Sequence, residues 1–171
     1  MDETPLPGEG APEYVQRMAT EKCAAAVAAL GGTALPVLAA DTIVVLDGQI
    51  LGKPRGPEEA GEMLSRLAGR RHEVITAFRV QHGTAAAGRR VSTAVAFRLL
   101  APAEIAAYVA HGEWQGKAGG YAIQGVASVF VSEVRGSFTN VVGLPLAETI
   151  ADLQAVGALA AWPPAGFGNS P

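Results

Sequence analysis

An acidic residue, Asp41, lies inside an otherwise apolar run, AADTIVVL, at residues 39–46 of this 171-residue chain. Burying an ionised carboxylate without a partner costs several kcal/mol, so a metal ion, a cation or hydrogen-bond donors must meet it. A purely structural interpretation, in which Asp41 caps a backbone segment or pairs with one basic residue, is equally open from this run alone. Other polar residues of the chain have to decide between the two.

Three lysines occupy positions from which an ammonium group can reach a pocket. Lys22 falls on the apolar stripe of an expected helix, Lys53 lies in an extended Gly-Lys-Pro, and Lys117 lies in the glycine-rich stretch GKAGG. Taken singly, each is more often a solvated lysine whose aliphatic stem covers apolar surface. Carboxylates with dispersed lysines, and without a histidine or cysteine cluster, suit a hard cation such as Mg²⁺ that holds a polyphosphate.

The stretch GKAGGYAIQG, residues 116–125, contains four glycines in ten residues. Such a backbone approaches ligands closely and exposes N–H groups to anions. A plain flexible loop is the alternative. Gln124 argues against it, because its amide offers the paired donor and acceptor that a nucleobase edge requires.

Common catalytic signatures are absent from the chain. The pair Gly116-Lys117 lacks the flanking residues of a Walker A loop, no G-x-G-x-x-G occurs, and no serine lies in a nucleophile elbow. The three histidines have no metal-ligand spacing, so His72, His82 and His111 are each expected at a surface or an edge. The single cysteine excludes an internal disulfide.

Composition and charge limit the partners. With 49% apolar and 17% charged residues, the chain belongs among globular proteins. A net charge of -3 without a basic cluster predicts no nucleic-acid partner. Its apolar stretches are far shorter than the roughly 20 residues that span a bilayer, and the polar N-terminus MDETPLPGEG is unlike a leader, so no membrane partner and a cytoplasmic location are predicted.

Periodicity and turn residues predict an α/β fold with a mixed sheet flanked by helices. A single domain over residues 1–171 is expected, with a frayed tail at 162–171. The strand over residues 36–46 is apolar on both faces, which indicates a central strand covered on each side. An Asp-Gly hairpin turn follows this strand, and a glycine-rich turn over residues 82–88 joins two later strands. Helices are expected at residues 12–30, 57–67, 102–110 and 145–156, and strands at 36–46, 72–81, 90–100 and 128–134.

Several stretches together resemble the Maf family of nucleoside triphosphate pyrophosphatases. They run in order from Glu3 to about Leu153: PLPGE and YVQRMATEK, AADTIVVLDGQILGKP, LAGRRHEVITAF, GKAGGYAIQG, and FTNVVGLPLAET. The resemblance implies an α/β fold with two lobes and a central cleft. It also implies metal-dependent hydrolysis of a nucleoside triphosphate to a monophosphate and pyrophosphate, and a homodimer, although the sequence shows no coiled-coil heptads.

The resemblance also implies roles for individual residues. The family's catalytic carboxylate falls on Asp41 and its second carboxylate on Glu3; both would hold the divalent cation, Mg²⁺ or Mn²⁺. Lys22 and Lys53 fall on lysines that face the phosphates, and Lys117 is a further one. The sequence does not separate a base from a metal ligand at Asp41.

Two further positions bear on the substrate. Members of the family with Thr after the catalytic Asp, and with Gln in the YAIQG stretch, are similar to the dTTP/UTP type; here those positions are Thr42 and Gln124. The resemblance therefore implies pyrimidine triphosphates, including modified uridine nucleotides. Both side chains are expected to read the base by hydrogen bonds.

One family segment is missing. Family members begin with a strand and a Ser-x-Ser-Pro-Arg-Arg loop before the part that matches Glu3, and neither occurs here. A truncated or misassigned start and a natural short variant are both consistent with this. Besides the pyrophosphatase, a catalytically impaired nucleotide-binding module linked to septum formation, or an inert fragment, stays open.

Overall fold

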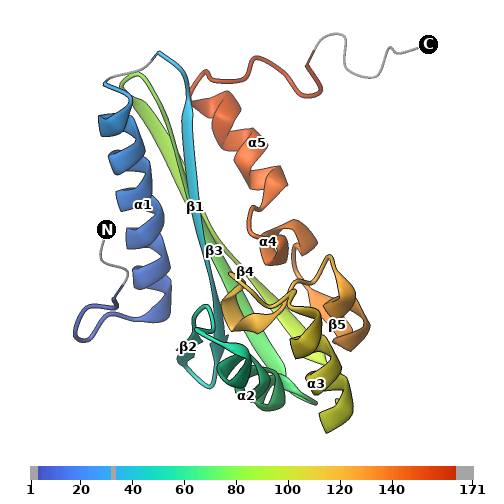
Figure 1. Ribbon diagram of the computed structural model, residues 1–171. Helices are drawn as coiled ribbons and strands as arrows, with labels where there is room; N and C mark the ends of the chain where they lie inside the picture. The colour runs from blue at the N-terminus through green and yellow to red at the C-terminus, as the bar shows by residue number, and fades with distance from the viewer. Residues whose placement is uncertain (1–3, 32–33, 165–171) are drawn as a thin grey trace.

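Strands and helices alternate along the chain, and the computed structural model describes residues 4–31 and 34–164 (Figure 1). In chain order the elements are α1 (Ala11–Ala29), β1 (Val37–Leu46), β2 (Gln49–Leu51), α2 (Pro57–Leu67), β3 (Arg71–His82), β4 (Ala85–Phe97), α3 (Pro102–His111), η1 (Ala118–Gly120), η2 (Val126–Phe130), β5 (Val131–Arg135), α4 (Phe138–Val142) and α5 (Leu146–Ala155). None of the helices in these ranges is long and apolar enough to cross a membrane.

Local sequence explains where the first three helices begin. Each has a proline in its first two positions, where the missing N–H costs no hydrogen bond. Each also has an acidic residue in its first turn, where the helix dipole favours negative charge. In α3 this residue is Glu104, whose carboxylate accepts a hydrogen bond from the Ala101 N–H at 2.9 Å.

The five strands form one sheet in the order β2-β1-β3-β4-β5. Each of the four pairings is antiparallel. The fold therefore combines helices with strands, and neighbouring strands of this sheet run in opposite directions. The predicted Asp-Gly turn between β1 and β2 is confirmed: Asp47 and Gly48 have φ of 51° and 76°. Two successive left-handed residues are the pattern of a tight hairpin turn that matches strand twist.

The helices lie on both faces of the sheet (Figure 1). Helix α1 packs through Tyr14, Val15 and Met18 on the face that carries Ile43 and Ile75. Helix α5 lies on the opposite face, where Phe78 and Val80 pack with Val156 just after the helix. Helices α2 and α3 cover the other end of the same face. Helices α1 and α5 thus lie towards one end of the long sheet, and α2 and α3 lie at its other end (Figure 1).

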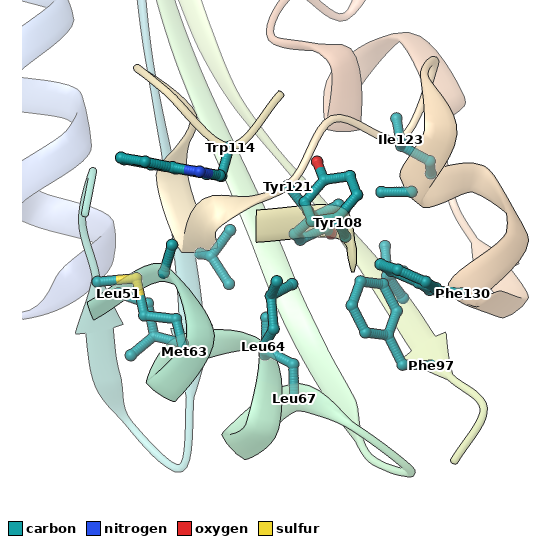
Figure 2. Packing of buried hydrophobic residues seen from close by; sticks show 14 of the residues in the cluster. Leu51, Met63, Leu64, Leu67, Phe97, Tyr108, Trp114, Tyr121, Ile123 and Phe130 are labelled. Carbon is teal, nitrogen blue, oxygen red and sulfur yellow. The ribbon is translucent and has the colours of Figure 1, made fainter. Parts of the chain in front are cut away.

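The largest apolar cluster lies under α2 and α3, and Figure 2 shows that the rings of Phe97, Tyr108, Tyr121 and Phe130 lie together in it, apart from Trp114. Tyr108 and Phe97 pack edge to face on Phe130 with ring centroids 5.3 and 6.0 Å apart, and Tyr121 packs on Phe97 at 4.8 Å. This cluster anchors the residues on each side of the glycine-rich stretch.

Three expectations about the strands need correction. The turn predicted over residues 82–88 is wrong, because Ala85 to Ala87 continue the ladder opposite residues 80–82 and only Gly83 and Thr84 connect the strands. The last strand begins at Val131, after the turn η2, and the short helix α4 gave no amphipathic signal. The first strand is not covered throughout, since Leu38 is 39% exposed.

The predicted tail, residues 162–171, is described only in part, because residues 165–171 lie outside the described residues. Trp162 lines a cavity together with Leu146 of α5.

Candidate active site

A cavity of about 250 Å³ lies beside β1, and six of the seven predicted site residues line it. The seventh, Glu3, lies outside the described residues. The lining residues are Lys22, Ala40, Asp41, Thr42, Val44, Lys53, Val74, Gly116, Lys117, Ala118, Tyr121, Ala122, Gln124, Val141, Val142 and Gly143.

The cavity follows the edge of β1. Side chains alternate between the two faces of a strand, yet Ala40, Asp41 and Thr42 all line the same space. Strand β2 pairs only with residues 44–46 of β1, so within the described ranges the rest of this edge has no neighbouring strand. A cavity against this edge reaches residues from both faces at once.

Asp41 points to the face of the sheet that α1 covers, where it meets Lys22. The Lys22 Nζ and Asp41 Oδ1 atoms are 2.5 Å apart, and the two side chains are 27% and 15% exposed. Helix α1 places Lys22 one turn after the buried Met18, on the side that faces the sheet. The expectation that a cation meets Asp41 thus has its partner, and the ion pair satisfies the structural and the functional interpretation alike.

Lys53 and Lys117 come together through backbone contacts of the glycine-rich stretch. The Gly119 N–H donates to the carbonyl of Gly52 at 3.0 Å. This hydrogen bond joins Gly119, two residues after Lys117, to Gly52, which directly precedes Lys53. Gly119 has φ of 68°, and a Cβ there would lie 2.9 Å from Val44 Cγ2. Glycine is therefore required at this close approach. The Gly120 N–H also donates internally, to Lys117 O, so these two N–H groups are not offered to an anion as expected.

Lys53, Lys117 and Gln124 are exposed to the solvent in the cavity. Within the described part of the chain, none of the three side chains makes a hydrogen bond or an ion pair. Two uncommitted ammonium groups and one amide therefore face the same space as the Lys22–Asp41 pair. Such an arrangement attracts an anion and leaves the amide available to a polar ligand.

Thr42 points to the opposite face of β1, where its hydroxyl is engaged. The Oγ1 atoms of Thr42 and Thr76 are 2.8 Å apart, and Thr76 donates to Asn140 O at 2.9 Å. Thr42 Oγ1 also lies 3.5 Å from the carbonyl of Gly143. These hydroxyl groups hold residues 140–143, of which Val141, Val142 and Gly143 line the cavity, and base reading by Thr42 stays a prediction.

Two buried polar groups near the site were not expected from the sequence. Asn140 is fully buried, and its Nδ2 donates to Val74 O and to Thr93 Oγ1, each at 3.0 Å. His72 is 4% exposed, with Nε2 at 2.7 Å from Tyr121 Oη, so the expected surface or edge position is wrong. Burial lowers the pKa of His72 to about 4 and keeps the ring neutral. The sequence gives no signal of this burial, since His72 lies between Arg71 and Glu73 and Asn140 between Thr139 and Val141.

A divalent cation finds one carboxylate here among the described residues, Asp41. No group of three or more His, Cys, Asp or Glu side chains suited to a metal occurs in those residues. Mg²⁺ ordinarily binds through one or two carboxylates, substrate phosphates and waters, without a cage of protein ligands. The donors present fit that mode of binding.

An α/β protein with an anion-attracting cleft is the class that this fold and site define. Within that class the chain belongs to the Maf family: residues 1–156 match the family described as Maf-like protein. Relatives named dTTP/UTP pyrophosphatase include one from Cereibacter sphaeroides, 53% identical over 92% of this chain and 80% of the relative. Another is from Anaeromyxobacter dehalogenans, 52% identical over 94% and 82%, and a third from Shewanella denitrificans, 48% over 91% and 79%.

Proposed function

We propose that this protein hydrolyses dTTP, UTP and modified pyrimidine nucleoside triphosphates to the monophosphate and pyrophosphate. One observation carries the proposal: the lysines, the carboxylate and the amide that the sequence singles out line one cavity in a member of the Maf family. The printed name of the relatives, dTTP/UTP pyrophosphatase, supports the substrate class.

The reaction needs an in-line water at the α-phosphorus, a group that takes its proton, and positive charge over the leaving pyrophosphate. Asp41 takes the proton in this proposal, because its carboxylate lies at the cavity edge and Lys22 holds it in place. Lys53 and Lys117 lie uncommitted in the same cavity and stabilise the charge that develops on the leaving group. Gln124 reads the base.

Asp41 and Glu3 are the residues that would hold the divalent cation, together with phosphate oxygens. Mg²⁺ or Mn²⁺, when bound, supplies neutralisation of the phosphate charge. The homodimer and the cytoplasmic location stay predictions.

The test is release of pyrophosphate from dTTP and UTP in the presence of Mg²⁺ or Mn²⁺. Replacing Asp41→Asn keeps the shape of the side chain and removes its capacity to take a proton. We expect a loss in kcat of about a hundredfold to ten-thousandfold, the usual contribution of a positioned acid or base. An Asp41→Asn protein with the turnover of the wild type removes the assignment, and calorimetric binding of dTTP without any turnover favours the binding module.

A further inference from the structure

Gln124 lies on a segment that is held from both sides. Its own side chain is exposed in the cavity, while Ala122, Ile123 and Ala127 around it are buried. A side chain with free torsions reads a base edge only when its backbone is held in one place, because recognition depends on the direction of the amide. The residues that hold this backbone therefore bear on selectivity.

After Gln124 the backbone is held by Glu113. Its Oε1 accepts a hydrogen bond from the Val126 N–H at 3.0 Å, and its Oε2 accepts one from the Ala127 N–H at 3.3 Å. The carboxylate lies so close to Gly125 that a Cβ on that glycine would be 1.8 Å from Oε1. The chain therefore wraps around this carboxylate immediately after Gln124.

Before Gln124 the backbone is held by Tyr108. The hydroxyl of Tyr108 accepts a hydrogen bond from the Ala122 N–H at 3.2 Å, and it lies close enough to Glu113 to lower the pKa of that carboxyl group. Tyr108 is 2% exposed and packs on Phe130 in the cluster that Figure 2 shows. A carboxylate and a hydroxyl thus hold N–H groups on both sides of the predicted base reader.

The charge of Glu113 strengthens this hold. Burial acts to raise its pKa, but the N–H groups of Val126 and Ala127 and the hydroxyl of Tyr108 together bring the pKa below its ordinary value. The group is therefore an ionised acceptor at neutral pH, and hydrogen bonds to charged acceptors are stronger than those to neutral ones.

We propose that Glu113, together with Tyr108, is a positioning residue that sets the direction of the Gln124 amide and thereby the selectivity for the base. This inference rests on the proposed function. It assigns to a residue of the turn after α3 a part in selectivity, although Glu113 does not line the cavity itself.

The test compares kcat/KM for dTTP with kcat/KM for dCTP, which differ at the polar edge of the base. Glu113→Gln keeps the size but replaces one acceptor oxygen by a donor that faces an N–H group. We expect the preference for dTTP to fall about tenfold, the scale on which a misplaced contact changes discrimination. Tyr108→Phe loses only the hydrogen bond from the Ala122 N–H and the effect of the hydroxyl on Glu113. It should lower the preference for dTTP less, and it provides the test if the Glu113→Gln protein does not fold.

A double-mutant cycle separates positioning from general stability. In a Gln124→Ala protein, Glu113→Gln should leave the dTTP preference unchanged, while its effect on the melting temperature persists. The matched control is Glu104→Gln, another carboxylate that accepts a backbone N–H at α3, and it should leave the preference unaltered.

An equal fall of the preference in both backgrounds, or a destabilised Glu113→Gln protein with the preference of the wild type, overturns the inference. So does a wild-type protein that does not distinguish dTTP from dCTP. Calorimetry with non-hydrolysable analogues of the two nucleotides gives the same ratio without turnover. Absence of hydrolysis by the wild type therefore counts against the proposed function alone.

Discussion

Removing the charge of Lys22 should affect both stability and activity, whereas removing that of Lys53 should affect activity alone. The Lys22 Nζ lies 2.5 Å from Asp41 Oδ1, and the Asp41 side chain is 15% exposed. Lys22→Met therefore leaves a mostly buried carboxylate without this partner. Lys53→Met changes an exposed side chain that has no hydrogen bond or ion pair in the described parts of the chain.

The magnitude follows from burial. A hydrogen bond to a charged group contributes about 1.5–3 kcal/mol when it is fully buried. Because both partners keep some exposure to water, we expect Lys22→Met to lower the free energy of unfolding by about 1 kcal/mol. For a chain of this size that is a fall in melting temperature of about 2–4 °C. Lys53→Met should stay within about 0.5 kcal/mol of the wild type, as surface changes usually do.

Urea unfolding and pyrophosphate release from dTTP measure the two effects side by side. In both variants we expect kcat/KM to fall about a hundredfold or more, since Lys22→Met removes the cation that holds Asp41 and Lys53→Met removes a positive charge over the phosphates. A Lys22→Met protein as stable as the wild type would show that the ion pair does not hold Asp41. Equal destabilisation by both changes would contradict the distinction between a paired and an uncommitted lysine.

Two further predictions concern buried positions. The pKa of His72 is lowered to about 4 in the folded state. Between pH 6.5 and 4 the unfolded state is therefore protonated at this residue while the folded state is not, and stability falls as the pH falls through this range. In that pH range the unfolding free energy of a His72→Gln protein should fall less steeply than that of the wild type, by up to about 1.4 kcal/mol per pH unit. Parallel plots of unfolding free energy against pH for the two proteins would refute this. Gly119→Ala should shift Lys117 through its contact with Val44 and lower kcat/KM about tenfold at unchanged Mg²⁺ dependence; unaltered kinetics would contradict the required close approach.

Local patterns were sufficient for most of the secondary structure. Proline and acidic residues at helix starts, and the Asp47-Gly48 turn, depend on contacts within a few residues, and the predicted α1, α2, α3 and α5 are confirmed. The turn at residues 82–88 failed for the opposite reason. Alanines there suit a strand only because β3 lies alongside them, and pairing with a distant strand is not visible in local sequence.

The same distinction holds for the site. An acidic residue in an apolar run needs a partner, so Asp41 could be predicted as a site residue from the sequence alone. The three lysines followed once the family resemblance was added. The paired state of Asp41 with Lys22 and the engaged hydroxyl of Thr42 could not be foreseen, because each needs two segments placed face to face. The burial of His72 was missed because an isolated histidine carries no periodic signal.

The sequence by itself determined the family, the α/β class and which charged side chains need a partner, since these follow from residue types and short spacings. Only the tertiary structure decided that the cavity lies along one strand edge and that Glu113 and Tyr108 hold the segment of Gln124. Those facts depend on contacts between residues 13 or more positions apart, such as the Glu113 carboxylate with the Val126 N–H, and on how chain packing removes water from them. Contacts at that separation arise from packing and not from local preference.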